Sequence, residues 1–294
     1  MKPSIAIYLV VLSTLIVGWT CMWLPTLGVE WRLINAYALV GIGIVYLTSH
    51  LLRMIRLALL SLGEREHAPG LMMAHVATAF PGSLIPFKFG ELLRLFSFMQ
   101  VSGDRRKALA IWLAERLADV LVITIFVLLL HLFKISIPAS MRSVFVAFAA
   151  AGSLCLLALM AIAKLFVYLN RHLVLNSSSE RGLRLLKASY AVRQLELDVH
   201  KAVEGRFTAF LLLSLLIWGV EIAALAMFIN SQPAGQGDFL SLFANGLFAS
   251  LPGGALQEAS SFGYYRSLAL ALMTPLVLGI MWCLFRGKSP EHVK

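Results

Sequence analysis

The sequence predicts an all-α, polytopic integral membrane protein that forms a single membrane domain over residues 1–294. Hydrophobic residues make up 60% of the chain and charged residues only 14%, whereas a soluble domain carries about 25% charged residues. The mean hydropathy is +0.84. Long apolar runs are separated by short polar loops, and no polar stretch is long enough to build a separate soluble domain.

About six full transmembrane helices are predicted, because six apolar runs approach or exceed the roughly 20 residues that a crossing requires. Pro25 and Gly28 are expected to end the first helix, since both residues interrupt or terminate helices. This first run is too long for the apolar part of an ordinary secretory signal, so we interpret it as a retained transmembrane helix. The six runs cover about residues 4–24, 33–62, 108–133, 142–169, 207–229 and 267–285.

Two further segments, residues 68–100 and 239–262, predict re-entrant helical hairpins. Each contains apolar stretches too short to cross alone and a proline–glycine break, at 81–90 in the first segment and 251–254 in the second. A broken backbone at membrane depth is tolerated only where protein or a water-filled cavity satisfies its polar groups. Two interrupted segments in corresponding halves of a chain are also a sequence signature of a transporter's binding site.

Basic residues dominate the segment 170–206, where they alternate with leucines near the helical period. This pattern predicts either an amphipathic helix on the inner leaflet or an ordinary solvated helix of a cytoplasmic loop. With six crossings, this segment, the basic cluster at 105–107 and both chain ends share one face of the membrane. Because cytoplasmic loops are enriched in lysine and arginine, we expect a bacterial cytoplasmic (inner) membrane protein with both termini in the cytoplasm.

Other protein classes are disfavoured. The formal net charge is +10, but no basic stripe alternates with exposed aromatic residues, so we expect no nucleic-acid partner. The cysteines stand alone in apolar segments, without metal-ligand spacing. No Ser-His-Asp order, metal cluster or Walker-type loop occurs in the sequence. We therefore expect no cofactor, no metal and no conventional hydrolase or ATPase site.

Charged side chains inside the apolar runs are the candidate functional residues. An ionised group near the bilayer centre costs at least about 2.5 kcal/mol, so such groups tend to pair within protein or line a watery cavity. Glu91 and Arg94 lie one helical turn apart at the start of the second arm of the first hairpin. A helix start favours an anion, and an arginine there is suited to hold a phosphate. A buried structural ion pair that pins the hairpin is the alternative.

The next helix carries Glu115, Arg116 and Asp119 in an otherwise apolar run. Glu115 and Asp119 share one face, because residues four positions apart on a helix do so. These two carboxylates either hold cationic headgroup moieties or pair with Arg94 and Arg53. A polar clamp between helices is the alternative interpretation.

Four further positions carry weaker signals. Arg53 and Arg56 lie near the end of the second apolar run and are expected at interface depth. Glu221 is alone in its apolar span, where a neutral glutamate bonded across helices is favoured over a proton carrier. Glu258 follows the second proline–glycine break.

The run from Pro86 to Arg94 (P-F-K-F-G-E-L-L-R) and the run from Glu115 to Asp119 (E-R-L-A-D) together resemble the transmembrane-region family of lysylphosphatidylglycerol synthases. The family signature looks like a proline, a glycine–glutamate pair and an arginine, then glutamate–arginine–x–x–aspartate on the next helix. The late stretch 251–254 followed by Glu258 is similar to a further family motif, although the loop after it is shorter here. The resemblance covers roughly residues 5–286.

This resemblance implies a relative of the flippase-like half of the multiple peptide resistance factor, which moves aminoacylated phosphatidylglycerol between leaflets. The soluble aminoacyl-transferase domain of the complete synthases has no counterpart here, so lysyl transfer is not expected. We expect a lipid flippase or transporter that moves a phospholipid or polyprenyl-linked headgroup through a polar intramembrane cavity. The expected substrate-binding residues are Glu91, Arg94, Glu115, Arg116, Asp119, Glu258 and Arg53.

Two other classes of function stay open. One is a membrane glycosyltransferase or lipid-modifying transferase that uses Glu91 or Asp119 as a base on a polyprenyl-linked donor. The other is a non-catalytic partner that anchors a lipid-modifying enzyme through the 170–206 segment. The expected ligand is a membrane lipid, either an anionic phospholipid or a polyprenyl-phosphate-linked lipid. A lipid-modifying enzyme and a second copy of the chain, in a homo-oligomer, are open as protein partners.

Overall fold

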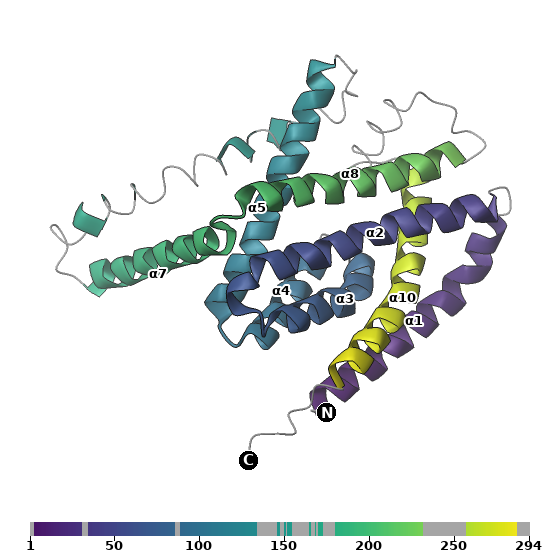
Figure 1. The fold of residues 1–294 in the computed structure, drawn as a ribbon, viewed down its shortest axis with the longest axis horizontal. Coiled ribbons are helices and arrows are strands. Elements are labelled where there is room, and N and C mark those ends of the chain that lie inside the picture. The colour runs from purple at the N-terminus through teal and green to yellow at the C-terminus, as the bar shows by residue number, and fades with distance from the viewer. Residues whose placement is uncertain are drawn as a thin grey trace.

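Helices make up the fold, and the described part of the chain contains no strand (Figure 1). The computed structural model describes residues 3–30, 35–85, 89–133, 180–231 and 257–286, with a few residues between 146 and 172. The prediction of an all-α membrane protein is confirmed. The helices are α1 (Pro3–Glu30), α2 (Ala36–Leu60), α3 (Ala68–Leu84), α4 (Phe89–Ser102), α5 (Arg105–Leu132), α7 (Glu180–Val203), α8 (Phe207–Ser231) and α10 (Gln257–Arg286), with the 3-10 turn η2 (Leu62–Glu64) after α2.

Among the described residues, three helices are long and apolar enough to cross a membrane by length and composition. These are α2, α8 and the stretch Phe262–Ile280 of α10. Helix α5 has 28 residues, but its first half carries several charged side chains. The predicted span at 142–169 lies mostly outside the described residues, so the number of six crossings stays a prediction.

Three predicted helix boundaries differ from the structure. Helix α1 continues through Pro25 to Glu30, and α3 continues through Pro81 to Leu84. Helix α10 begins at Gln257, about ten residues before the predicted start. Proline removes one backbone donor, but a membrane helix continues where neighbouring groups satisfy the freed carbonyl. At Pro81 that neighbour is Tyr8, whose hydroxyl donates a 2.8 Å hydrogen bond to the carbonyl of Ala77, four residues earlier.

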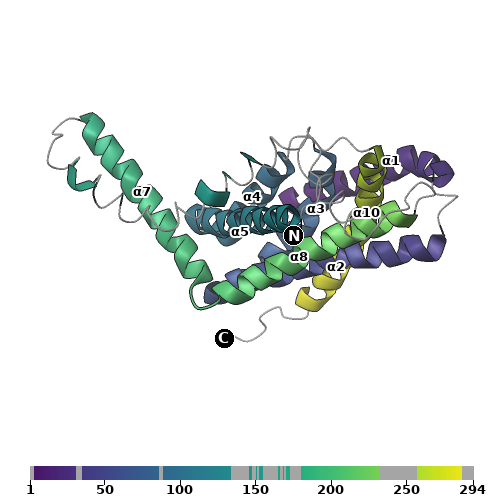
Figure 2. The same ribbon diagram turned by 90° about the horizontal axis from the view of Figure 1, so that it is seen from above.

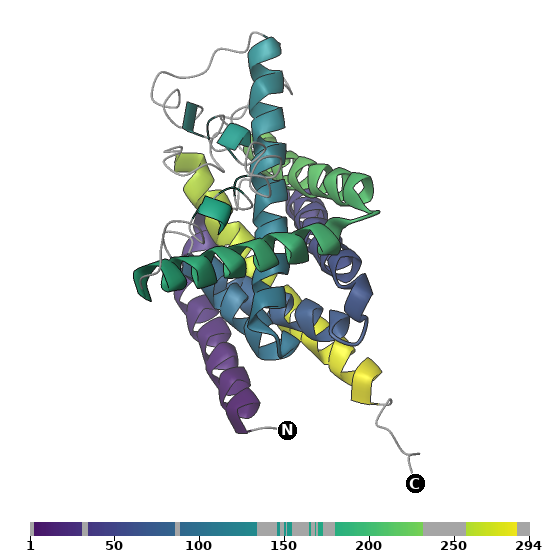
Figure 3. The same ribbon diagram turned by 90° about the vertical axis from the view of Figure 1, so that its left-hand side faces the viewer.

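Helices α2 and α8 lie side by side and run antiparallel (Figures 1 and 2). In the contacts between the two helices, the residue numbers rise along α2 as those of the partner residues on α8 fall. The two helices therefore run in opposite directions. Helix α5 crosses the pair steeply and contacts α8 (Figures 1 and 3). The α2–α8 interface is polar at three levels, where Arg53 contacts Glu221, Arg56 contacts Ser214, and Arg206 contacts the carbonyl of Leu59.

The first predicted hairpin is present as an antiparallel pair, α3 and α4. Near the connection, a Cβ added to Gly90 would lie 2.5 Å from the Cα of Gly82, so the two backbones approach closely there. At the far end, a Cβ added to Gly70 would lie 2.5 Å from Cγ1 of Val101, so a side chain of α4 packs against this glycine of α3. That this pair re-enters the membrane stays a prediction. The second predicted hairpin, at 239–262, lies mostly outside the described residues.

The hydrophobic core joins α1, α2, α3, α8 and α10. Phe80, Phe228 and Phe262 are among its buried members, and Phe228 lies 5.3 Å from Phe262 between ring centroids. Helix α7 contributes to a separate cluster, in which Val199 packs near Ala110 and Ala114 of α5. The N-terminal end of α7 projects away from the other helices (Figures 1 and 2). The predicted helix within 170–206 is therefore present, and its position on a leaflet stays a prediction.

Candidate functional site

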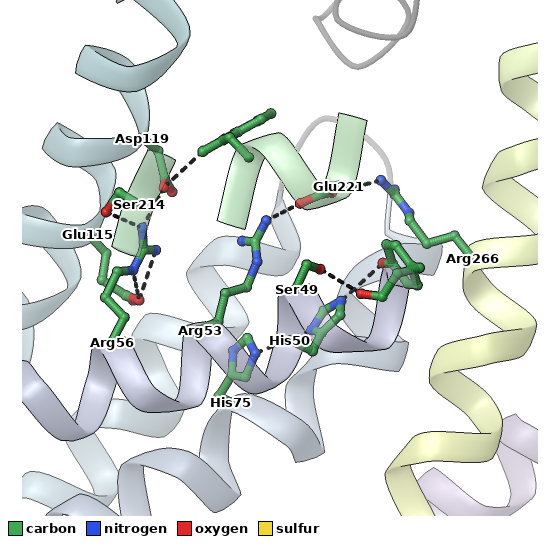
Figure 4. Close-up of polar contacts among 12 residues, drawn as sticks. Ser49, His50, Arg53, Arg56, His75, Glu115, Asp119, Ser214, Glu221 and Arg266 are labelled. Carbon is green, nitrogen blue, oxygen red and sulfur yellow. Dashed lines mark hydrogen bonds and ion pairs between the residues drawn. The ribbon is translucent and has the colours of Figure 1, made fainter. Parts of the chain in front are cut away.

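A buried arginine, Arg56 of α2, organises the polar centre of the molecule (Figure 4). Its Nη1 donates to Asp119 Oδ1 at 2.8 Å and to Ser214 Oγ at 3.1 Å. Its Nε and Nη2 donate to Glu115 Oε1 at 3.2 and 3.0 Å. The side chains of Arg56 and Glu115 are 0% exposed and that of Asp119 is 6% exposed. We call these four residues the Arg56 clamp, and it joins α2, α5 and α8.

The clamp continues into the α3–α4 hairpin through Arg94. Arg94 Nη2 donates to Glu115 Oε2 at 2.5 Å, and its guanidinium lies 5.3 Å from the centre of the Phe98 ring. Glu91 then pairs with Arg94 at 3.8 Å and with Arg116 at 3.2 Å. These ion pairs hold the start of α4 against the charged turn of α5. The predicted Glu91–Arg94 pair is therefore present.

A second charged group lies at another level of the α2–α8 interface. The carboxylate of Glu221 forms an ion pair with Arg53 of α2, and its other oxygen lies 3.7 Å from Arg266 Nη1 of α10. The side chains are 11% exposed for Arg53, 15% for Glu221 and 38% for Arg266. We call these three residues the Glu221 bridge. It connects three helices at a more accessible position than the clamp (Figure 4).

Two buried histidines lie beside the bridge. His50 Nδ1 is 3.3 Å from His75 Nε2, and His50 Nε2 is 3.1 Å from the hydroxyl of Tyr46. Each contact requires only one proton between its two atoms, so a neutral pair satisfies both. His75 is buried at 3% exposure.

The charge balance differs between the two groups. The clamp together with its neighbours holds three arginines and three carboxylates, so its charges cancel when every group is ionised. Among the described residues, the Glu221 bridge holds two arginines and one carboxylate, so its own charges sum to +1 when every group is ionised. Buried Nε–H groups without a hydrogen-bond acceptor among the described residues belong to Arg53, Arg94, Arg116 and Arg266.

The structure brings together five of the predicted site residues on α4 and α5. Arg53 pairs with Glu221 and not with Glu115 or Asp119. The backbone of Glu258 lies in the first turn of α10, and its side chain is outside the described residues. The predicted site residues that lie on α4 and α5 and contact one another are Glu91, Arg94, Glu115, Arg116 and Asp119.

Arg56, expected at interface depth, is fully enclosed by protein, because α5 and α8 supply a partner for every nitrogen of its guanidinium. Its depth in the membrane stays a prediction. Glu221, expected as a neutral glutamate bonded across helices, is bonded across helices, but its partners are the two arginines Arg53 and Arg266. Ser214 and Trp218 were not considered as site residues, and Trp218 Nε1 donates to Asp119 Oδ1 at 3.1 Å. The sequence signal that could have pointed to Ser214 and Trp218 is their spacing of four positions on α8, which places both on one helix face.

An all-α membrane protein whose helices enclose a network of arginines and carboxylates is the class that the fold and the site define. Residues 5–255 match the family described as lysylphosphatidylglycerol synthase TM region, and the chain belongs to this family. The family suggested by the sequence motifs is thus confirmed, and it consists of membrane proteins related to lipid modification or lipid flipping. The chain matches no curated protein and no solved structure.

Proposed function

We propose that this protein is a lipid flippase that moves the phosphate-bearing headgroup of a phospholipid or polyprenyl-linked lipid across the membrane. The observation that carries the proposal is the Glu221 bridge, where Arg53 and Arg266 share one carboxylate. Arg53 is only 11% exposed, and an excess positive charge at a largely enclosed position is costly. An anion that binds beside the two arginines removes that cost.

The chemistry of the arginines favours a phosphate. A guanidinium presents its N–H donors in a fixed fork that matches phosphate oxygens in bidentate fashion. Arg53 and Arg266 each have a buried Nε–H with no acceptor among the described residues. A phosphate that accepts these bonds competes with Glu221 for the same two guanidinium groups. This competition supplies the alternation between an empty and an occupied site that transport needs.

The Arg56 clamp has a different role in this proposal. Its charged groups are almost fully buried, and Arg56 is bonded through all three guanidinium nitrogens. Breaking it would leave unpaired charges inside the protein, which is strongly unfavourable. The clamp therefore fixes α2, α5 and α8, while headgroup exchange takes place at the more accessible Arg53, Arg266 and Arg116.

We propose that the protein lies in the bacterial cytoplasmic membrane with both termini in the cytoplasm, because the basic loops gather on that face in the predicted topology. Labelling of a cysteine introduced beside each terminus, in intact and in opened cells, tests the orientation. Labelling of either terminus in intact cells would contradict it.

A reconstituted transport assay tests the function. Vesicles containing the protein and a headgroup-labelled phosphatidylglycerol report the rate at which label reaches the opposite leaflet. Arg53→Gln and Arg266→Gln are expected to slow this rate by about tenfold or more, since each removes a charge-assisted bond on the order of 1.5–3 kcal/mol. Arg65→Gln, an exposed position before α3, is the matched control.

The outcomes separate the open classes of function. Wild-type transport rates in folded Arg53→Gln and Arg266→Gln proteins would remove the basis of the proposal. A lipid product of altered mass, formed from a polyprenyl-linked donor by the purified protein, would favour a transferase. Loss of function only after changes in α7 would favour an anchoring role for a lipid-modifying enzyme.

A further inference from the structure

A basic cavity of about 420 Å³ lies at the end of the molecule where α5 and α8 begin. This volume falls in the range of small-ligand sites, which is about 300–1,000 Å³. Among the described residues that line it, Asp198 is the one carboxylate, and it pairs with Arg106 at 2.5 Å. The cationic side chains of the lining are Arg106, Lys107, Lys201 and Arg206. The lining therefore has a clear excess of positive charge.

Helix starts add to this positive field. The cavity is lined by His67, which precedes the first residue of α3, and by Arg206, which precedes the first residue of α8. Arg106 and Lys107 of the lining belong to the first turn of α5. The N-terminus of a helix carries a partial positive charge and free backbone N–H groups, so it favours an anion. At the start of α5 the carboxylate of Asp104 already accepts from the backbone N–H of Arg106 at 2.9 Å. The starts of α3 and α8 therefore carry this part of the positive field.

Two glycines fix these helix starts. Gly103 and Gly205 have φ angles of +68° and +71°, a conformation that glycine adopts readily and other residues rarely. Gly103 makes the tight turn before α5, and Gly205 makes the one before α8. The backbone is thus shaped so that both helices begin at the wall of the cavity.

The cavity is separate from the charge network of the candidate site. None of its lining residues belongs to the Arg56 clamp or the Glu221 bridge. It is close to the clamp, since Leu60 follows Arg56 by one turn of α2 and Ile111 precedes Glu115 by one turn of α5. A ligand in the cavity would therefore lie next to the clamp without touching its charged groups.

We infer that this cavity is a second anion site, which binds the phosphate of an anionic lipid headgroup at the membrane face where α5 and α8 begin. Lysines and arginines at helix ends near the membrane surface are suited to such headgroups, and each contributes about fivefold in affinity. The inference stands on the cavity and its charges, and it does not require the protein to be a flippase.

Native mass spectrometry of the purified full-length chain tests the inference. The probes are phosphatidylglycerol, phosphatidylcholine as the zwitterionic comparison, and inorganic phosphate. The double variant Lys107→Gln/Lys201→Gln is expected to bind phosphatidylglycerol more weakly, by about fivefold for each lysine, with phosphatidylcholine unchanged. Lys187→Gln/Arg193→Gln removes two charges from exposed positions of α7 outside the cavity and is the matched control.

Three results would overturn the inference. Unchanged phosphatidylglycerol binding in the cavity variant removes the site, and an equal loss in the control variant shows diffuse surface attraction instead. Lysine-dependent binding of inorganic phosphate without that of phosphatidylglycerol assigns the cavity to soluble phosphates and contradicts the lipid. In an Arg53→Gln background, the loss of phosphatidylglycerol binding caused by Lys107→Gln/Lys201→Gln should be the same as in the wild type. The flippase proposal is judged separately, by transport in that same protein.

Discussion

Arg53 and Arg56 lie one turn apart on α2 and pair with different carboxylates: Arg53 with Glu221 of α8, and Arg56 with Glu115 and Asp119 of α5. The first pair is partly accessible and shares its carboxylate with another arginine, whereas the second is enclosed and fully bonded. Two arginines that look equivalent in the sequence therefore have different surroundings. We expect Arg56 to be structural and propose Arg53 as part of the binding site.

Replacing Arg56 with leucine is expected to destabilise the protein by about 3–5 kcal/mol, because Glu115 and Asp119 would remain as buried carboxylates with fewer partners. Ser214→Ala removes one neutral partner of the same guanidinium and should cost only about 1 kcal/mol. Unfolding of both variants in detergent measures the difference. Equal stability of the two variants would show that the clamp does not hold the helices.

Gly90→Ala is expected to destabilise the α3–α4 hairpin by about 1–3 kcal/mol, as overpacking of a close contact does. The new Cβ would lie 2.5 Å from backbone atoms of Gly82. Backbone atoms cannot move aside as the end of a flexible side chain can. Gly279→Ala in α10 is the control, since nothing lies within 4 Å of its added Cβ. Thermal unfolding in detergent gives the comparison. A Gly90→Ala protein as stable as the control would mean that the two backbones do not meet.

Tyr8→Phe is expected to cost about 1 kcal/mol, because the carbonyl of Ala77 loses its hydrogen bond. In a Pro81→Ala background the restored backbone N–H of residue 81 can serve that carbonyl, so the cost of Tyr8→Phe should fall. A double-mutant cycle of unfolding free energies measures this coupling. Additive effects would contradict the link between the tyrosine and the proline.

Glu221→Gln is expected to tighten the binding of phosphatidylglycerol by about tenfold and to slow its transport. The change removes the carboxylate that competes with the headgroup phosphate, an effect on the order of 1.4 kcal/mol. Binding and transport assays on the same reconstituted protein provide the test, and Glu66→Gln, at an exposed loop position, is the control. Weaker binding in the Glu221→Gln protein would mean that the carboxylate recruits the ligand and does not compete with it.

The sequence was sufficient for the helical membrane fold, because apolar runs of membrane length have few alternatives. It was less reliable at helix ends. Pro25 and Pro81 read as helix ends, yet both lie inside helices. At Pro81 the freed carbonyl bonds to Tyr8, which is 69 positions away from Ala77 in the chain. A contact between such distant positions cannot be inferred from local residue preferences.

In the candidate site, too, local spacing could be predicted from the sequence, whereas contacts between distant segments could not. The i,i+3 spacing of Glu91 and Arg94 predicted a pair that is present, and Glu115 and Asp119, placed on one face by their i,i+4 spacing, both contact Arg56. The partners of Arg56 and Glu221 were not predicted, because they are on helices far away in the sequence. A charge near the end of an apolar run suggests an interface position. Only the packing of α5 and α8 against α2 reveals that Arg56 is enclosed.

The three polar contacts between α2 and α8 also restrict how the molecule can move. They follow one another at intervals of three residues along α2, from Arg53 to Arg56 to Leu59. Sliding one helix along the other would break all three together, so the register of the pair is fixed. If the molecule changes shape as a headgroup passes, we expect α2 and α8 to move together with α5, which the Arg56 clamp ties to them, while the remaining helices rearrange around these three.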